Sequence, residues 1–330
     1  MVDSQSFPFE SKTSPKLWQG AYSPFERYTQ EDIADIVEYA RIHGVRVMVE
    51  FDMPGHAASW CVGYPEICPS ASCTQPLNPA SPATFELIQS LLGECTGNAP
   101  LQGLFPSSMI HLGGDEVDTS CWTKEPSIVA WLAARNLTVD GGYGYFVNKT
   151  AHLAAEQGRR PVQWNEVWDH FGTALPKDAV VHVWNDRGAA TRATEAGYAI
   201  LNSQGWYLDG LGDSWSNMYV NDPSSGVSAD AVKAGLVLGG QGEMWGETVD
   251  TSDIESTVWP RMGAIAEQLW SPSSATNCSS TAACNANIDS AYPRFKNFRC
   301  LLNRRGIRAA PVNNAIARSA PPGAGSCFDQ

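Results

Sequence analysis

Two adjacent carboxylic acids, Asp115 and Glu116, follow a pair of glycines in the segment His111-Leu-Gly-Gly-Asp-Glu-Val117. Neighbouring side chains of a regular strand point to opposite faces, but Gly113 and Gly114 allow the chain to leave that geometry, so both acids can face one pocket. Two carboxylates so close together cannot both ionise easily. The one whose pKa rises can therefore supply a proton near the working pH.

Such a pair suits glycoside hydrolysis, which needs one carboxyl group to protonate the leaving oxygen and negative charge beside an oxocarbenium-like centre. The alternative is a structural role, because an Asp-Glu pair at the end of a strand also suits the N-terminus of the next helix. The residues around the pair decide between these two interpretations.

Tryptophan is frequent, with twelve in the chain, and four of them follow predicted strands: Trp164, Trp184, Trp206 and Trp245. The apolar C–H faces of sugar rings stack on aromatic planes, so tryptophans beside carboxylates suggest a carbohydrate pocket. A single tryptophan at such a position could equally belong to the core. Four at equivalent positions favour the pocket.

These residues require strands that end at a common edge. The segments that we interpret as strands are 45–51, 108–112, 160–164, 180–184, 198–202 and 236–240. Helices are predicted between them: one capped by Thr29-Gln-Glu-Asp32 and ended by Gly44, one that opens at Ser81-Pro82, and one over about 143–157. The Pro-, Ser- and Cys-rich stretch 272–287 is predicted to be a surface loop closed by Cys278 and Cys284.

Alternation of strands and helices at this spacing predicts an α/β fold with parallel strands and right-handed crossovers. An open doubly wound sheet and a closed barrel both satisfy the pattern. The barrel is favoured because six strand ends each carry a cluster of acidic or aromatic residues, as in a (β/α)8 TIM-type barrel. Neither a P-loop nor a G-x-G-x-x-G motif follows any strand, so nucleotide binding has no support.

The charge balance limits the class of partner. The chain has 330 residues, 43% of them hydrophobic, and a formal net charge of −13. Such an acidic surface argues against nucleic acid and anionic membranes as partners. No apolar run reaches the roughly 18 residues that a membrane-spanning helix needs.

Cysteines and glycosylation sequons point to an oxidising compartment. The nine cysteines are dispersed and lack the spacing of a zinc site, so we expect disulfides and no metal. Asn136, Asn148 and Asn277 each begin an N-x-S/T sequon. The polar start Met1-Val-Asp-Ser-Gln-Ser is no signal peptide, so we expect a lysosomal or secreted, extracellular protein whose native N-terminus lies elsewhere.

Six segments taken together resemble a known family. They are Val2-Asp-Ser-Gln-Ser-Phe-Pro-Phe9, Glu50-Phe-Asp-Met-Pro-Gly-His56, His111-Leu-Gly-Gly-Asp-Glu-Val117, Trp206-Tyr-Leu-Asp209, Trp245-Gly-Glu247 and Trp259-Pro-Arg261. In this order, from residue 2 to about residue 310, the chain resembles the family 20 glycoside hydrolases, specifically the eukaryotic β-N-acetylhexosaminidases.

The resemblance implies a substrate-assisted retaining mechanism without a cofactor, in which the 2-acetamido oxygen of the sugar attacks its own anomeric carbon to give an oxazolinium. It implies that Glu116 is the general acid and then base, and that Asp115 holds the acetamido N–H. Tyr207 would donate to the acetamido oxygen, and His56 and Asp3 would form a supporting pair that sets the protonation of the acid.

The resemblance also implies how the sugar is bound. Trp164, Trp184 and Trp245 would wall the acetamido and ring pocket, while Asp209 and Glu247 would hydrogen-bond the sugar hydroxyls. The partner would be an oligosaccharide or glycoconjugate that ends in N-acetylhexosamine. Because Asp209-Gly210 stands where members that prefer charged substrates carry Asn-Arg, we expect a preference for neutral terminal GlcNAc or GalNAc. Relatives commonly form homodimers.

Against the family pattern, the chain begins late. The first strand with its sugar-gripping arginine, the first helix and most of the second strand are missing, which predicts an N-terminally truncated chain. The resemblance assigns residues 1–310 to the catalytic barrel and 311–330 to a C-terminal extension tied by a Cys300–Cys327 disulfide. Cys121 is expected to bond to Cys68 or Cys73. The odd number of cysteines leaves at least one thiol free or paired outside this sequence.

Two other functions stay open at the level of sequence. One is a retaining glycosidase with a carboxylate nucleophile such as Glu247 or Glu166. The other is a non-catalytic sugar-binding or adhesion protein on a degenerate barrel, which the missing arginine favours and the intact Asp115, Glu116 and Tyr207 disfavour.

Overall fold

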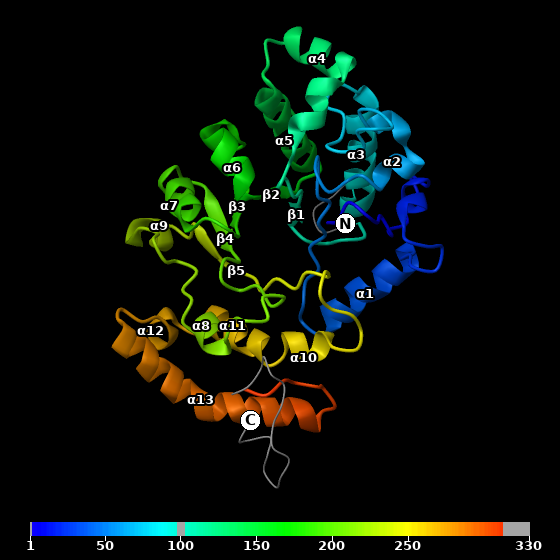
Figure 1. Ribbon diagram of the computed structural model, residues 1–330. Coiled ribbons are helices and arrows are strands. Elements are labelled where there is room, and N and C mark those ends of the chain that lie inside the picture. Colours follow the sequence, from blue (N-terminus) through cyan, green and yellow to red (C-terminus); the bar gives the residue numbers. More distant parts are fainter. Residues whose placement is uncertain (1, 98–102, 313–330) are drawn as a thin grey trace. The chain divides into compact units, whose positions relative to one another are not determined.

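The computed structural model describes residues 2–97 and 103–312 (Figure 1). The chain divides into two compact units. The first comprises Met1–His182 and Glu195–Ala199, and the second comprises Val183–Thr194 and Ile200–Gln330. Both units combine parallel strands with helices, as the alternating sequence pattern predicts.

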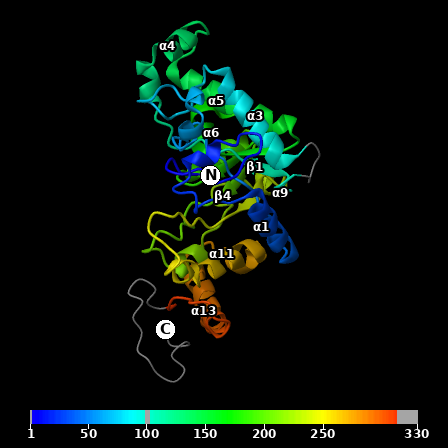
Figure 2. The same ribbon diagram turned by 90° about the vertical axis from the view of Figure 1, so that its right-hand side faces the viewer.

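The first unit is built on three parallel strands, β1 (Met109–His111), β2 (Arg160–Trp164) and β3 (Val180–Val183). Ile110 pairs with Pro161, and Gln163 pairs with Val181. These strands confirm the predictions for 108–112, 160–164 and 180–184. Helices α3 (Pro82–Thr96) and α5 (Val139–Glu156) pack against each other and lie side by side in both ribbon views (Figure 1; Figure 2).

The predicted strand over 45–51 is wrong in its extent. The chain runs alongside β1 from Val49 to Met53, where the Phe51 N–H donates to the His111 carbonyl at 3.1 Å and the Met53 N–H donates to the Leu112 carbonyl at 3.2 Å. The only bridge assigned here joins Glu50 to His111. Because β1 is three residues long, it pairs with the end of the apolar segment alone, and Val45 is 59% exposed.

Helix starts in this unit follow local capping rules. Helix α1 (Gln30–Ile42) begins with the predicted capping box, in which Thr29 Oγ1 accepts from the Asp32 N–H and Asp32 accepts from the Thr29 N–H. Helix α5 starts four residues before the predicted 143, because Thr138 Oγ1 accepts from the Gly141 N–H at 3.0 Å. The other helical segments of the first unit are η1 (Leu17–Gly20), α2 (Trp60–Gly63), η2 (Pro65–Ile67), η3 (Thr119–Lys124), α4 (Pro126–Ala133), α6 (Asn165–Phe171) and η4 (Gly172–Ala174).

Aromatic side chains fill the core of the first unit near the N-terminus. Phe7 and Phe9 are fully buried, and the Phe7 ring lies 5.0 Å from that of Trp60 and 6.2 Å from that of Phe51. Burial of such a side chain stabilises the fold by about 1.5–3 kcal/mol. These contacts hold the N-terminal segment against the strand that leads to Asp52.

The second unit contains two parallel strands, β4 (Ala199–Asn202) and β5 (Val237–Gly240), both at predicted positions. The helices of this unit are α7 (Arg187–Glu195), α8 (Trp215–Tyr219), α9 (Ala229–Lys233), α10 (Ile254–Val258), α11 (Arg261–Trp270), α12 (Ser273–Thr276) and α13 (Thr281–Arg304). The last residue of α7, Glu195, belongs to the first unit. Ala264 of α11 packs against Ala291 and Phe295 of α13, and the two helices run beside each other in Figure 2.

The stretch 272–287 is more helical than predicted. Helix α12 covers Ser273–Thr276, and α13 begins at Thr281. Ser280 caps α13 by accepting from the Ala283 N–H at 3.2 Å, and alanine is the strongest helix former. The predicted extension over 311–330 lies outside the described residues from residue 313 onward. Within residues 2–97 and 103–312, none of the helices combines the length and apolar character that crossing a bilayer demands.

Candidate active site

His56 and Asp52 form the central contact of the acidic cluster in the first unit. His56 Nδ1 donates to Asp52 Oδ2 at 2.7 Å, and Asp52 is 2% exposed. Asp52 Oδ1 also accepts from the Gly114 N–H at 2.8 Å. The hydrogen bond to Asp52 outweighs burial and, with the nearby carboxylates, raises the pKa of His56 to about 9. The imidazole is therefore a cation at neutral pH.

Asp115 is the most perturbed carboxyl group of the cluster. Its side chain is 13% exposed, and its Oδ1 lies 3.9 Å from His56 Nδ1. Burial, followed by the charge of Asp52, raises the pKa of Asp115 to about 9. Burial likewise raises the pKa of Asp52. Two carboxyl groups in contact titrate as one pair, and burial disfavours the form in which both are ionised, which favours a proton shared between Asp52 and Asp115.

Glu116 differs from its neighbour in exposure. Its side chain is 60% exposed, and its Oε2 lies 3.6 Å from His56 Nε2. Its backbone has a φ of +50°, which is rare for a residue with a side chain. The strand has therefore ended before Glu116, and the turned backbone directs Asp115 inward while Glu116 stays accessible. The two adjacent acids can thus have different roles.

The two glycines before the acids are required by space as well as by conformation. Gly113 and Gly114 have φ angles of +64° and +100°. A β-carbon on Gly113 would lie 1.8 Å from Asp52 Oδ1, and one on Gly114 would lie 2.5 Å from Val167. The Gly114 carbonyl accepts from the buried hydroxyl of Tyr143. Close approach of Asp52 to this backbone is possible only because residue 113 lacks a side chain.

Trp164 is held in a buried cluster of aromatic and ionisable groups. Its Nε1–H donates to Glu50 Oε1 at 3.0 Å, and its ring stacks on His182 at 4.1 Å. His111 lies 3.1 Å from both Glu50 and His182. Burial opposes ionisation of Glu50, but His111 and the Trp164 hydrogen bond hold its pKa below the usual value. At 2% exposure, Trp164 offers almost no surface to solvent.

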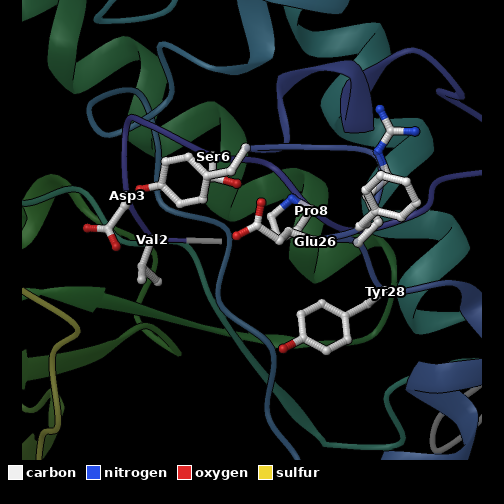
Figure 3. A pocket seen from close by; sticks show the side chains of 9 residues that line it. Val2, Asp3, Ser6, Pro8, Glu26 and Tyr28 are labelled. Atoms are coloured by element: carbon white, nitrogen blue, oxygen red, sulfur yellow. The ribbon is translucent and has the colours of Figure 1, made fainter. Parts of the chain in front are cut away.

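Asp3 lies in the wall of a pocket of about 510 Å³, together with Val2, Ser6, Pro8, Tyr22, Phe25, Glu26, Arg27 and Tyr28. Figure 3 shows Asp3, Glu26 and Tyr28 around this space. Three of the aromatic rings are exposed: Tyr22, Phe25 and Tyr28. The acceptor of the His56 hydrogen bond is Asp52 and not the Asp3 of the predicted supporting pair, because the turn over 52–56 brings residues four apart into contact.

In the second unit, Tyr207 and Trp184 lie together. Their ring centroids are 6.1 Å apart, and both side chains are partly exposed. Tyr207 follows β4 and forms a parallel bridge with Glu243, in which the Leu208 N–H donates to the Glu243 carbonyl at 2.7 Å. The backbone thus positions the tyrosine from both sides.

Asp209 and Glu247 lie near each other in the second unit. Burial and then the charge of Glu247 raise the pKa of Asp209. Asp209 Oδ1 is buried and has no hydrogen-bond partner among the described residues, whereas Glu247 is exposed and Trp245 partly exposed. A buried carboxylate oxygen without a donor is a strong acceptor for a ligand hydroxyl.

Asp52, His56 and Asp115 also have the mutual distances of a metal site, since one ligand atom of each lies within 4.8 Å of the others. His56 Nδ1 donates a proton to Asp52, so a metal would bind this cluster only by displacing that proton.

A disulfide anchors the segment that follows the acidic pair. Of the two partners that the sequence predicts for Cys121, Cys73 is the one to which it is joined, while Cys68 is joined to Cys61. Cys278 is joined to Cys284, as the sequence suggested. Cys95 is a buried free thiol. The predicted Cys300–Cys327 bond involves Cys327, which lies outside the described residues.

The three sequons have different environments. Asn136 is exposed in the turn between α4 and α5, with a φ of +53°. Asn148 lies within α5, and the Thr150 of its sequon is fully buried. Asn277 Nδ2 donates to Asp222 Oδ2 at 2.5 Å. Glycosylation at these positions stays a prediction, and Asn136 offers the most accessible amide.

Three roles are not predicted from the sequence: in the first unit, Asp52 as the partner of His56 and the buried Tyr143, and in the second unit, the contacts of Arg261. The four-residue spacing of Asp52 and His56 around Met53-Pro-Gly55 was an available signal for the first. Tyr143 and Arg261 contact backbone carbonyls at distant positions, and no local pattern reveals such contacts.

Comparisons with known proteins place the chain in a family. The profile of "Glycosyl hydrolase family 20, catalytic domain" matches residues 1–273. Beta-hexosaminidase 1 of Arabidopsis thaliana is 43% identical over 333 residues, covering 100% of this chain and 59% of that protein. Beta-hexosaminidase subunit alpha of Rattus norvegicus is 35% identical, covering 95% of this chain and 59% of that protein. The chain thus spans about 59% of the length of these curated relatives.

A solved structure supports the fold as well. The chitobiase of Flavobacterium johnsoniae superposes with a TM-score of 0.73 at 30% sequence identity, covering 90% of this chain and 46% of that one. The similarity therefore extends through nearly the whole chain and over less than half of the larger protein.

Proposed function

The chain belongs to glycosyl hydrolase family 20, and from this premise we propose that it is the catalytic part of a β-N-acetylhexosaminidase. The proposed reaction releases terminal, non-reducing β-linked GlcNAc or GalNAc with retention of configuration, through an oxazolinium formed by the substrate itself. The observation that carries the proposal is the different placement of two adjacent acids: the Asp115 side chain is 13% exposed, whereas the Glu116 side chain is 60% exposed and lies 3.6 Å from His56.

In the first step, Glu116 protonates the glycosidic oxygen while the acetamido oxygen attacks the anomeric carbon. The carbon–oxygen bond to the leaving group breaks, and its electron pair takes the proton from Glu116. The His56 imidazolium, 3.6 Å from Glu116 Oε2, stabilises the carboxylate that Glu116 becomes. In the second step, Glu116 accepts a proton from water as the water attacks the anomeric carbon and the oxazolinium opens.

Asp115 acts on the nucleophile rather than on the leaving group. Positive charge develops on the acetamido nitrogen as the oxazolinium forms, and a carboxylate that accepts the N–H stabilises this charge. The shared proton allows this, because Asp52 can hold the proton when Asp115 becomes ionised. A preorganised acceptor of this kind contributes most where water is excluded, and Asp115 is 13% exposed.

The remaining predicted residues bind and orient the sugar. Tyr207 donates its hydroxyl to the acetamido oxygen, and Asp209 and Glu247 accept hydrogen bonds from sugar hydroxyls. Trp184 and Trp245 are partly exposed and offer stacking surface, whereas Trp164 contributes as a buried boundary of the acetamido pocket. We retain Asp3 as a supporting residue, since its carboxyl group lines an open pocket.

The carboxylate of Asp209 also determines which sugars are accepted. Its Oδ1 is buried and has no hydrogen-bond partner in the part of the chain that the structure describes, so an anionic substrate group placed beside it would be repelled with little screening by water. We therefore propose neutral terminal GlcNAc or GalNAc as the substrate. Comparable values of kcat/KM on a 6-sulfated and an unsulfated substrate would rule this out.

The compartment and the complete fold are part of the same proposal. The three disulfides formed within residues 2–97 and 103–312 fit an oxidising environment, so we infer a lysosomal or extracellular protein. The parallel strands with intervening helices, together with the TM-score of 0.73 to a relative, support a (β/α)8 barrel to which this chain contributes. A homodimer stays a prediction.

The decisive experiment offers the full chain two fluorogenic substrates that differ only at carbon 2. We expect release of 4-methylumbelliferone from the N-acetyl-β-D-glucosaminide and none from the β-D-glucoside, because a 2-hydroxyl cannot act as the nucleophile. A thiazoline that mimics the oxazolinium should inhibit competitively. Equal turnover of both substrates would instead indicate an enzyme nucleophile such as Glu247 or Glu166, and sugar binding by a folded, inactive chain would indicate the adhesion function.

A further inference from the structure

Arg261 is one of the few arginines that the fold buries, and nothing in the catalytic proposal uses it. It is 5% exposed and opens helix α11 in the second unit. Burying a guanidinium is costly unless its donors are satisfied. The hydrogen-bond acceptors around the Arg261 guanidinium therefore indicate the role of this residue.

Four backbone carbonyls accept from this guanidinium. Nη1 donates to the Gly210 carbonyl at 2.8 Å and to the Asp213 carbonyl at 3.2 Å. Nη2 donates to the Thr257 carbonyl at 2.8 Å and also to the Leu208 carbonyl. Three of these acceptors belong to one loop, residues 208–213, and the fourth lies one turn before Arg261 itself. The side chain thus ties the loop to the start of α11.

That loop carries Asp209, whose Oδ1 is buried without a hydrogen-bond partner among the described residues. The loop is held at one end by the pairing of Leu208 with Glu243, which fixes Tyr207 as well. Beyond Leu208, a bond from the Asp213 N–H to the Gly210 carbonyl at 3.0 Å closes the turn. Arg261 connects this turn to the start of α11.

From this arrangement we propose that Arg261 is a positioning residue that holds the 208–213 loop so that Asp209 meets the sugar hydroxyls. The inference rests on the proposed function. Tyr207 and Asp209 lie close together in the same sequence motif, but they are held in place differently. Tyr207 is positioned by strand-like pairing, and Asp209 is positioned by Arg261. Loss of Arg261 should therefore weaken substrate binding more than it slows the chemical step.

The test compares Arg261→Met with a matched control, Arg299→Met. Arg299 is also buried, at 7% exposure, and donates to two backbone carbonyls, those of Ala309 at 3.3 Å and Ala310 at 3.0 Å. Both variants remove a buried guanidinium from the second unit. We expect R261M to raise KM for the N-acetylglucosaminide about 10- to 100-fold, the range for loss of one charged hydrogen bond, with kcat within about threefold. R299M should lower Tm but leave KM unchanged.

Asp209→Asn supplies the second arm. If Arg261 acts through Asp209, the R261M/D209N double variant should bind substrate no more weakly than the weaker single variant. Losses that multiply in the double variant would overturn the proposal, because they would mean that the two residues act independently. If Arg261 had a purely structural role, the losses would multiply in the double variant, and R261M and R299M would have equal effects on KM.

Amide hydrogen exchange without substrate keeps this inference distinct from the proposed function. R261M should accelerate exchange in residues 208–213, and R299M should not. An inactive wild-type chain would refute the hexosaminidase proposal but leave this readout intact. Unchanged exchange in the loop of R261M would refute the positioning role, whatever the activity.

Discussion

His56 donates from Nδ1 to Asp52 at 2.7 Å, which turns its other nitrogen, Nε2, toward Glu116 at 3.6 Å. Asp52 is 2% exposed and also accepts from the Gly114 backbone, so the orientation of the imidazole is fixed from within the fold. The Asp52 carboxylate thus accepts hydrogen bonds both from His56 and from the backbone that precedes the acidic pair.

The general acid should be indispensable for poor leaving groups. Replacing Glu116 with Gln keeps the size and removes the proton, so we expect kcat on an unactivated disaccharide to fall about 10²- to 10⁴-fold. A substrate whose leaving group needs no protonation should lose much less. Equal losses on both substrates, measured as kcat, would mean that Glu116 is not the acid.

The histidine should impose an upper limit on the pH range of activity. With a pKa of about 9, His56 carries its charge through neutral pH and loses it as the pH rises through that value. We therefore expect kcat/KM to fall above about pH 9 in the wild-type protein. His56→Asn should lower kcat/KM roughly 10- to 100-fold and remove that limb of the profile. A limb that survives in H56N would assign it to another group.

Stability should fall as the pH rises, in contrast to proteins whose carboxylates are salt-bridged. The folded pKa values of Asp115 and His56 lie at about 9, above their ordinary values of 3.8 and 6.5. The folded state therefore binds more protons than the unfolded state over 3.8 to 9 for Asp115 and over 6.5 to 9 for His56. The free energy of unfolding must decrease across these ranges.

Asp115→Asn isolates the contribution of the carboxyl group. It imitates the protonated acid, so we expect it to match the wild type near pH 4 and to be more stable by about 1–3 kcal/mol at pH 8. Urea denaturation at the two pH values measures this. Asp35→Asn, at an exposed position on α1, is the control and should leave the free energy of unfolding unchanged at both pH values. A D115N variant that is less stable at pH 8 would contradict the shared proton.

The glycine before the acidic pair should tolerate no side chain. Gly113 and Gly158 have similar φ angles, +64° and +69°, but a β-carbon would meet Asp52 at 1.8 Å in the first case and nothing within 4 Å in the second. Gly158→Ala should cost about 1–2 kcal/mol for the backbone conformation alone. Gly113→Ala should cost at least about 3 kcal/mol and also abolish activity, because Asp52 is displaced. Thermal denaturation of the two variants separates clash from conformation.

The fold predictions that the structure confirms depend on residues close together in the sequence. The capping box of Thr29 and Asp32 needs only three residues of context, and the strand at 160–164 is bounded by Gly158 and a tryptophan. Helix α13 was missed at its start because Ser, Thr and Asn around 272–280 resemble a loop, and only the cap at Ser280 shows that a helix follows. The segment 45–51 was overextended because its pairing depends on a three-residue partner strand.

The predictions for the functional residues also differ between local motifs and long-range contacts. Motif similarity predicts roles for Asp115, Glu116 and His56, which stay predictions, but the identity of the carboxylate bonded to His56 depends on the turn over 52–56 rather than on residue type. Arg261 was marked only as part of the Trp259-Pro-Arg261 motif, and nothing local indicated its role, since the Leu208 carbonyl that it binds lies 53 residues away in sequence. Long-range contacts between a side chain and the backbone leave no periodicity for sequence reasoning to detect.

The bond between Cys73 and Cys121 has a practical consequence for anyone who makes this protein. It fastens η3, three residues after Glu116, to a segment 48 residues earlier, and cross-links over long loops restrict the unfolded chain most. Bacterial cytoplasm, where thiols stay reduced, would yield a chain whose segment after the acidic pair is untethered. Preparations from periplasm or a eukaryotic secretory pathway are the ones in which its chemistry can be judged.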